Sequence, residues 1–437
     1  MHAPARRIPL LMVLLSIVVF NYVDRYALGI VLQSIRSDLH LTDTQLGFLT
    51  GIAFALFYSI MGVPIARWAD RGNRVAIIAL TTVLWSIAVF SCGLAKTFVQ
   101  LLLIRVAIAV GEAGCIPTAF SLLADYFDRA ERPRASAILG LGGPLGSALG
   151  FVLAGWLNQL YGWRITFMLL GPPGLLLATL AWFGLKEPRS AWKSGREAYS
   201  DSHADAVMRQ PSMREVGLVL WSSATFRDLV MCLAVIFFFN YGILQWLPTF
   251  FMRSYGLTSG EIGSWLAVIV GLGGMSGSYL GGELASRYAA KNERLQLKVM
   301  SIAIVGCGGV STFAYLTNNH YFAIALMGLF LLGVTTINGP LFATLQTLVP
   351  DRMRAVAFAL VYLFANLIGM GLGPLAAGAL SDAYASWAHD ESLRYALLTL
   401  SPGYAWAAWH GWRGSRTVMR ELATQAVPTG SLTPLVV

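Results

Sequence analysis

Long apolar stretches separated by short polar ones dominate this chain of 437 residues. Runs of about 20 apolar residues form helices that span the ~30 Å hydrocarbon core of a bilayer. Six runs precede a polar central segment, at about 8–32, 45–69, 75–95, 98–125, 134–158 and 164–185. Six more follow it, at about 226–252, 262–286, 297–316, 321–348, 354–380 and 393–412. The pattern predicts an all-α membrane protein with twelve transmembrane helices in two six-helix halves.

The same pattern divides the chain into four parts, which are an N-terminal half (1–185), a linker (186–225), a C-terminal half (226–412) and a tail (413–437). The first apolar run continues past residue 20 without a small-residue cleavage site, so we expect a retained helix rather than a signal peptide. In the linker, MREVGLVLW favours a short amphipathic helix on the membrane, with a plain linker as the alternative. The sequence Ser-Pro-Gly at 401–403 interrupts the last run.

Composition agrees with a lipid environment. Hydrophobic residues make up 56% of the chain and charged residues only 12%, whereas soluble domains carry roughly 25% charged residues. The 44 glycines suit closely packed membrane helices. The four cysteines and six histidines show no metal-binding or redox spacing and no helical cluster. We therefore expect no metal, no cofactor and no enzymatic activity. The alternative is a polytopic membrane enzyme, which would need a convergent nucleophile, metal or acid–base cluster.

Positive charge is concentrated on one side of the predicted membrane. Of the 31 lysines and arginines, the loops on the opposite side hold only Arg36, Lys96, Arg164, Arg253 and Arg394. Such a bias sets orientation in the membrane and places both termini in the cytoplasm. It also explains the net charge of +9 without a nucleic-acid partner.

The two halves repeat one another. LTDTQLG at 41–47 matches LTSGEIG at 257–263, and ARWADR at 66–71 matches GELASR at 282–287 with the same offset. Further matches join DRAERPRASA to DRMRAVA and GFVLAGWL to GPLAAGAL. Folds with such repeats place the substrate site at the membrane midplane between the halves.

Ionisable residues deep inside the predicted helices occur only in the first half. FNYVDRYALGI carries Asp24 and Arg25, and the helix at 98–125 carries Arg105 and Glu112. Adjacent residues on a helix point about 100° apart, so Asp24 and Arg25 are not expected to pair with each other. At ~1.5 Å per residue, Arg105 comes level with both of them, and Glu112 lies nearer the cytoplasm.

Charges at this depth are costly, and they indicate function by default. A carboxylate in a low dielectric favours its protonated form, and a nearby arginine opposes this. We expect Asp24 and Glu112 to couple protons to transport, and Arg25 or Arg105 to bind the anionic group of a substrate. The structural alternative is two ion pairs that lock the two helices together.

ARWADRGNR resembles the signature loop of the major facilitator superfamily, although Ala66 replaces its leading glycine and Gly72 is shifted by one. GGPLG at 142–146 resembles the glycine-rich motif of its antiporters. The resemblance covers the whole chain and implies transport by alternating access. It also implies that Asp70, Arg71 and Arg74 act in gating at the cytoplasmic junction of the halves.

FNYVDR and RVAIAVGEAGCIPTAFSLLADYF closely resemble spinster-type lipid transporters, here a bacterial homologue. Eukaryotic spinsters move sphingosine-1-phosphate and lysophospholipids, so the resemblance implies an amphiphilic anionic lipid as substrate. It also implies a monomer in the bacterial inner membrane. The anion:cation symporters, which carry hexuronates and similar organic anions, share the pattern of the first helix and are the alternative. A transport-inactive receptor of the same fold is a third possibility.

The second half supplies polar residues in place of charges. FFFNYGILQW at 237–246 and TTIN at 335–338 place amphipathic side chains in otherwise apolar helices. Such residues commonly serve in packing and interfacial anchoring. The alternative is that they line the cavity opposite the charges. The expected cavity-lining residues are Tyr22, Asn240, Tyr241, Gln245, Trp246, Thr335 and Asn338.

Overall fold

The computed structural model describes residues 7–188, 213–288, 292–350 and 353–426, and every regular element within these ranges is helical. The helices of the first half are α1 (Arg7–Leu39), α2 (Asp43–Thr50), α3 (Ile52–Arg71), α4 (Arg74–Cys92), α5 (Phe98–Ala113), α6 (Cys115–Tyr126), α7 (Arg132–Gly140) and α8 (Gly142–Gly184). The later helices are α10 (Met213–Ser222), α11 (Ala224–Tyr255), α12 (Ser259–Tyr288), α13 (Glu293–Leu316), α14 (His320–Leu348), α15 (Arg354–Ala365), η3 (Asn366–Leu372), α16 (Gly373–Ala388), η4 (His389–Glu391), α17 (Ser392–Leu400) and α18 (Gly403–Ala426).

Ten segments of the described chain are long and apolar enough to cross a membrane. Two of them, Arg132–Gly184 and Val356–Ala423, are double length and fold back on themselves. In the first, the chain reverses at Gly162, whose φ of 79° lies in the left-handed region that glycine tolerates. In the second, the chain turns at η4. The ten segments thus make twelve crossings, and the predicted all-α membrane fold is confirmed.

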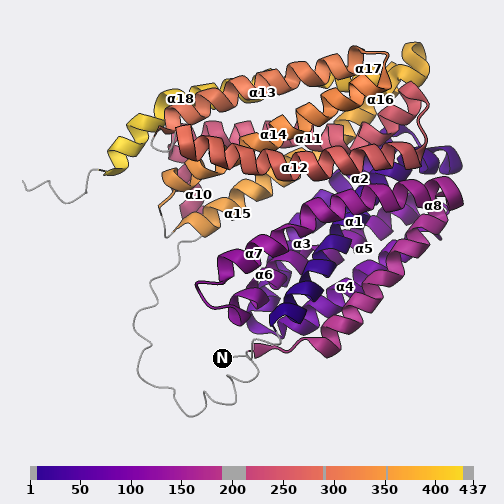
Figure 1. Ribbon diagram of the computed structural model, residues 1–437, viewed down its shortest axis with the longest axis horizontal. Coiled ribbons are helices and arrows are strands. Elements are labelled where there is room, and N and C mark those ends of the chain that lie inside the picture. The colour runs from indigo at the N-terminus through magenta and orange to yellow at the C-terminus, as the bar shows by residue number, and fades with distance from the viewer. Residues whose placement is uncertain (1–6, 189–212, 289–291, 351–352, 427–437) are drawn as a thin grey trace, which may run out of the picture.

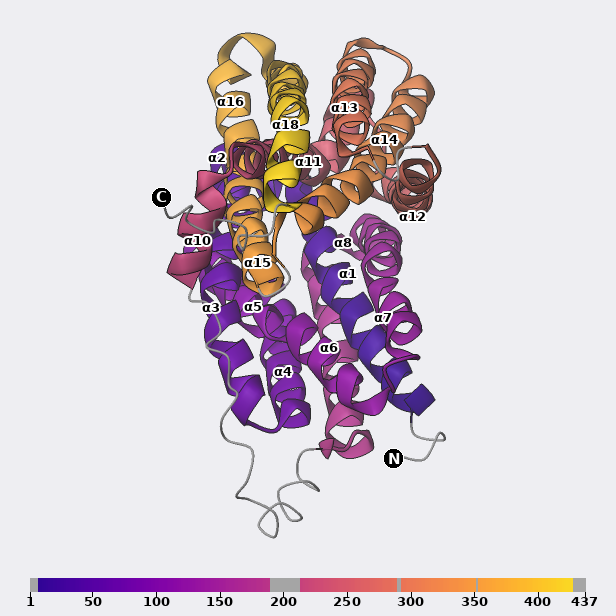
Figure 2. The ribbon, with the colours of Figure 1, turned by 90° about the vertical axis from the view of Figure 1, so that its left-hand side faces the viewer.

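The two halves lie side by side as separate bundles (Figures 1 and 2). The start of α1 and the end of α18 lie on one face, toward the left in Figure 1, which we call the terminal face. There, Arg7 pairs with Glu131 at 2.6 Å, and Glu421 of α18 accepts hydrogen bonds from the first residues of α11. The opposite face, which carries the α1–α2 and α11–α12 turns, is called the far face.

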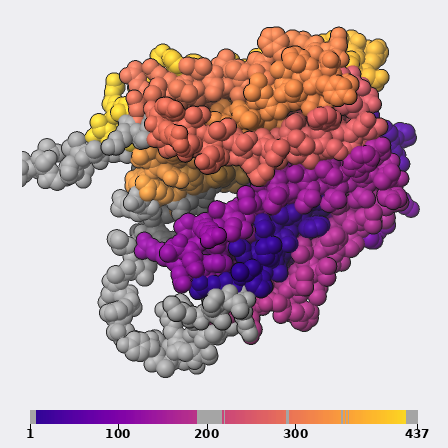
Figure 3. All heavy atoms as spheres, in the orientation of Figure 1, coloured from indigo at the N-terminus to yellow at the C-terminus, as the bar shows by residue number. Residues whose placement is uncertain are grey.

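The sequence repeat corresponds to a structural repeat at the far face. Thr42 caps α2 in a capping box with Gln45, and Thr258 with Glu261 forms the same arrangement at α12. Each capped helix docks on the opposite half, because α2 packs against α16 and α12 packs against α8. The two bundles meet along the boundary between purple and orange atoms in Figure 3.

Contacts between α8 and α12 begin near the far face and continue at least to Ala148 of α8, whose Cβ lies close to Gly271 of α12. Gly155 and Gly263 bring the two backbones together near the far face. Another face of α8 packs on α1, where a Cβ at Gly150 would lie 2.8 Å from the carbonyl oxygen of Val23. Gly146 approaches the Val19 carbonyl still more closely. The glycines of and after the GGPLG motif therefore allow α1 and α8 to pack backbone against backbone.

Several predicted boundaries fall inside helices. MREVGLVLW forms helix α10, as one of the two alternatives predicted. The predicted tail at 413–437 begins within α18, which continues to Ala426. The interruption at 401–403 separates α17 from α18 as expected. The central linker residues 189–212 and the tail residues 427–437 lie outside the described residues.

Candidate functional site

The four intramembrane charges gather in the middle of the first half, on α1 and α5. Asp24, Arg105 and Glu112 are 2%, 3% and 0% exposed, and the Arg25 side chain is 14% exposed. Ionised groups in such surroundings require compensation, because their desolvation is costly. The compensation differs for each of the four.

Arg25 and Glu112 form an ion pair. The Arg25 Nη2 atom donates to Glu112 Oε2 at 2.7 Å. The guanidinium also lies about 5 Å from the ring centres of Tyr22, Phe54 and Tyr58, a distance at which cations are attracted to aromatic faces. The sequence placed Glu112 nearer the cytoplasm than Arg25, and the long arginine side chain reaches it near the end of α5 at Ala113.

Asp24 has a neutral partner that the sequence did not suggest. The indole N–H of Trp85, on α4, donates to Asp24 Oδ2 at 2.6 Å. The other carboxylate oxygen has no hydrogen-bond partner in the described part of the chain. The sequence offered only one sign of this contact, a tryptophan within an apolar helix. Tryptophans in membrane helices also face lipid, so the sign did not identify a partner for Asp24.

Arg105 carries a charge with no direct counterpart. No hydrogen bond or ion pair of its guanidinium occurs within the described ranges, and its Nε is enclosed without a partner. The guanidinium lies 5.0 Å from the ring centre of Phe54. An unpaired buried guanidinium is suited to bind an anion, because it presents five donors in a fixed geometry.

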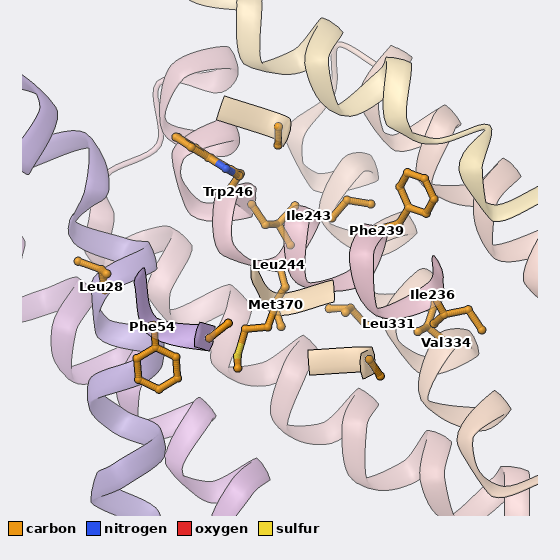
Figure 4. Close-up of a cluster of buried hydrophobic side chains, with 14 of the residues drawn as sticks. Leu28, Phe54, Ile236, Phe239, Ile243, Leu244, Trp246, Leu331, Val334 and Met370 are labelled. Carbon is orange, nitrogen blue, oxygen red and sulfur yellow. The ribbon is translucent and has the colours of Figure 1, made fainter. Parts of the chain in front are cut away.

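Arg105 borders a narrow cavity between the two halves. The first half contributes Arg25, Tyr26, Thr50, Phe54 and Arg105 to its wall. The second half contributes Tyr241, Leu244, Gln245, Met370 and Pro374. Figure 4 shows Met370 and Leu244 extending from the second half toward Phe54. Tyr26, Thr50, Phe54 and Met370 were not singled out from the sequence, because ordinary packing explains them equally well.

The other predicted cavity residues lie elsewhere. Trp246 is fully buried and donates from its indole nitrogen to the Pro374 carbonyl at 2.9 Å. Thr335 donates to backbone carbonyls of α12 and α14. Tyr22 lies against the Arg25 guanidinium. Asn240 has a buried side-chain oxygen without a hydrogen-bond partner in the described chain, and Asn338 is half-buried in α14.

The predicted gating residues lie at the terminal face. Asp70 and Arg71 are exposed at the end of α3. Arg74 is fully buried, and its guanidinium pairs with Glu187 at 2.5 Å and with Asp125 at 2.7 Å. All of these Arg74 contacts lie within the first half, so in this structure Arg74 ties α4 to the ends of α6 and α8.

A second charged cluster, missed from the sequence, closes the far face. Arg253 of α11 binds both carboxylate oxygens of Asp43, at the start of α2. Asp382 of α16 accepts hydrogen bonds from the backbone N–H groups of Asp43 and Thr44 at 3.0 and 2.7 Å. The N-terminus of α2 is therefore held by side chains of the other half, and the negative charge of Asp382 suits that helix end.

Within the described residues, no group of three or more histidine, cysteine, aspartate or glutamate side chains is placed to hold a metal ion. The four cysteines are free and buried.

Comparisons with known proteins agree with this architecture. Residues 14–388 match the sequence pattern that defines the Major Facilitator Superfamily. The chain is 30% identical to an MFS-type efflux pump of Mycolicibacterium smegmatis, over 91% of this chain and 90% of that protein. It is 24% identical to the hexuronate transporter of Bacillus subtilis, over 86% and 88% of the two chains.

Among solved structures, a bacterial homologue of the human lysosomal transporter Spinster is similar in its inward-facing, unoccupied conformation. The TM-score is 0.83 at 27% identity, covering 96% of this chain and 99% of that one. The occupied inward-facing form gives a TM-score of 0.79. The twelve crossings, the repeated halves and these similarities establish that the chain belongs to the major facilitator superfamily, as a spinster-type member.

Proposed function

We propose that this transporter moves an amphiphilic anion together with a proton, with Arg105 binding the anionic group and Asp24 carrying the proton. The observation that carries the proposal is the unequal compensation of the four charges. Arg25 and Glu112 neutralise each other at 2.7 Å, whereas Asp24 has only a neutral donor and Arg105 has no hydrogen-bonded partner in the described chain.

Charge balance explains why the two would travel together. The four ionised side chains sum to zero, so an anion bound at Arg105 leaves the cluster with one excess negative charge. Such an excess is costly in a low-dielectric site. Protonation of Asp24 restores neutrality, so anion and proton favour each other's binding. Glu112 was also predicted to titrate, and its direct contact with Arg25 opposes protonation.

Alternating access would require the halves to separate at the far face and close at the terminal face. The similarity to inward-facing structures supports assigning the terminal face to the cytoplasm, in agreement with the bias of lysine and arginine. We therefore propose an orientation with both termini cytoplasmic, in a bacterial inner membrane. Asp70 and Arg71 would then contribute to closure on the cytoplasmic side.

The cavity wall supports an amphiphile with an anionic head, such as a lysophospholipid or a sphingosine-1-phosphate-like lipid. Both charged wall residues come from the first half, and the second half contributes Leu244, Met370 and Pro374. A charged head group at Arg105 would thus face Leu244, Met370 and Pro374, which suit a hydrocarbon chain. Arginine binds phosphate and carboxylate groups in bidentate geometry.

A small organic acid is the second candidate. Relatives of this chain include a hexuronate transporter and a galactarate/D-glucarate transporter. Tyr241 and Gln245 of the second half reach the same cavity and could bind the hydroxyl groups of a sugar acid.

Transport into proteoliposomes under an imposed pH gradient tests both candidates. We expect the protein to transport lysophosphatidate or sphingosine-1-phosphate, and Arg105→Gln to lose that transport. Arg413→Gln, at a half-exposed arginine of α18, is the matched control and should transport normally. Transport of glucuronate alone would overturn the lipid assignment, and undiminished transport by Arg105→Gln would overturn the anion site. Undiminished pH-driven transport by Asp24→Asn would overturn the proton site.

A further inference from the structure

Trp85 links Asp24 of α1 to a helix that carries none of the four charges. We infer that Trp85 is a positioning residue for proton coupling: its indole N–H holds the ionised Asp24 carboxylate against α4, apart from the Arg25–Glu112 ion pair. This inference rests on the proposed role of Asp24 as the proton carrier.

The indole is fixed in place by close packing on two sides. Trp85 is 1% exposed. On one side, a Cβ at Gly111 of α5 would lie 2.7 Å from the Trp85 Cβ. On the other, a Cβ at Gly174 of α8 would lie 3.6 Å from the far edge of the indole ring. Trp85 therefore has little freedom to swing, and its N–H keeps a defined direction toward Asp24.

This packing also places Trp85 against the residue that precedes Glu112. Gly111 directly precedes Glu112 in α5, so one side chain contacts Asp24 and the residue adjacent to Glu112. A movement of α5 that disturbs the Arg25–Glu112 pair would press on Trp85 and alter its hydrogen bond to Asp24.

Among the residues that the structure describes, this hydrogen bond is the only direct anchor of the Asp24 carboxylate. Arg105 and Glu112 of α5 act on Asp24 electrostatically, Cys92 of α4 lies close enough to be affected by the Asp24 charge, and the neighbouring Arg25 is bound to Glu112. A hydrogen bond to the charged form of a carboxylate favours that form. A neutral donor does so without cancelling the charge, so the carboxylate stays oriented and still able to accept a proton.

Trp85→Phe removes the N–H and keeps an aromatic ring in the packed site. The protonation of Asp24 can be followed without any substrate, by pH-dependent infrared spectroscopy of the protein in lipid. The relevant carboxyl band is the one that Asp24→Asn abolishes. Hydrogen bonds to charged groups are strong enough that we expect the pH midpoint of this band to rise by about one unit in Trp85→Phe, a tenfold increase in proton affinity. Trp182→Phe, at an exposed tryptophan of α8, is the control and should leave the midpoint unchanged.

An unchanged midpoint in Trp85→Phe would overturn the positioning role, because a packing role alone does not alter the proton affinity of Asp24. If Trp85→Phe does not fold, indole ¹⁵N–¹H resonances of the unmodified protein provide the test. One of them should shift with pH, and that shift should disappear in Asp24→Asn. The absence of any such resonance would contradict the inference. Failure of the proposed function can be distinguished from failure of this inference. It would appear as undiminished pH-driven transport by Asp24→Asn, independently of the result for Trp85→Phe.

Discussion

Arg253 and Asp43 join the two halves of the transporter through a bidentate ion pair. The guanidinium Nη1 and Nη2 atoms lie 2.6 and 2.7 Å from the two carboxylate oxygens, and both side chains are buried. Ser381 of the second half also donates to Asp43, at 2.7 Å. The far face cannot open without breaking this pair.

Asp43→Asn should therefore weaken closure of the far face. Removing one partner of a buried ion pair costs about 3–5 kcal/mol. Asp43 also pairs with Arg36 of the first half at 3.2 Å, so the share of this cost that comes from Arg253 falls on the conformation in which the halves meet. We expect distances between spin labels on the far-face ends of α2 and α16 to shift toward longer values. Asp38→Asn is the control, because Asp38 pairs with Arg164 within the first half. An unchanged distance distribution in Asp43→Asn would show that this pair does not govern closure.

The two carboxylates of the central cluster should respond oppositely in stability. Glu112→Gln leaves the Arg25 guanidinium without its charged partner, so thermal unfolding should occur at a lower temperature. Asp24→Asn removes a charge that has only a neutral donor, so its unfolding temperature should be unchanged or higher. Fluorescence-monitored unfolding of both variants in the same lipid makes the comparison. A lower unfolding temperature for Asp24→Asn than for Glu112→Gln would contradict the assignment of the pairs.

The contact between α8 and α12 should not tolerate a side chain at Gly155. A Cβ there would lie 2.5 Å from the carbonyl oxygen of Ser259 and 3.2 Å from the Cα of Gly263. Gly155→Ala should hold the halves apart at the far face and reduce transport while the protein still inserts and folds. Gly309→Ala in α13 is the matched control, because nothing lies within 4 Å of the added carbon. Equal transport by the two variants would show that the close contact is dispensable.

Arg74 should be needed for the integrity of the first half. Its guanidinium is buried among Glu187, Asp125 and the carbonyl oxygen of Ser121. Arg74→Gln leaves the Glu187 carboxylate, itself 5% exposed, without its cation. We expect the free energy of unfolding to fall by about 3–5 kcal/mol. This loss would be measured as a lower yield in the membrane and a lower unfolding temperature. Arg67→Gln, at an exposed position of α3, should match the unmodified protein, and an equal loss in both would contradict the prediction.

Hydrophobic periodicity was sufficient to predict the crossings, because the thickness of the bilayer fixes helix length independently of tertiary contacts. The repeat predicted the equivalence of the two halves, and Thr42 and Thr258 confirm it as caps of equivalent helices. The buried charges could be recognised because ionisable residues are rare at that depth.

Partner identity was harder to predict, because it depends on helix rotation and tilt. Asp43 resembled an ordinary residue of a helix first turn, and its partner Arg253 is distant in sequence. Trp85 could equally have faced lipid. The Arg25–Glu112 pair could not be predicted from depth alone, because it depends on the reach of the arginine side chain.

The backbone contact between α1 and α8 has a mechanical consequence. One stretch of α8 lies against Val19 and Val23, the residues that flank the turn leading to Asp24. One to two turns further along, Gly155 and Asn158 of the same helix contact the second half, with the Asn158 side chain donating to Ser259 at 3.1 Å. Because the backbones of α1 and α8 are in direct contact there, a shift of α1 near Asp24 would displace α8 with it. The strength of the far-face closure would then depend on the charge of a carboxylate that never touches it.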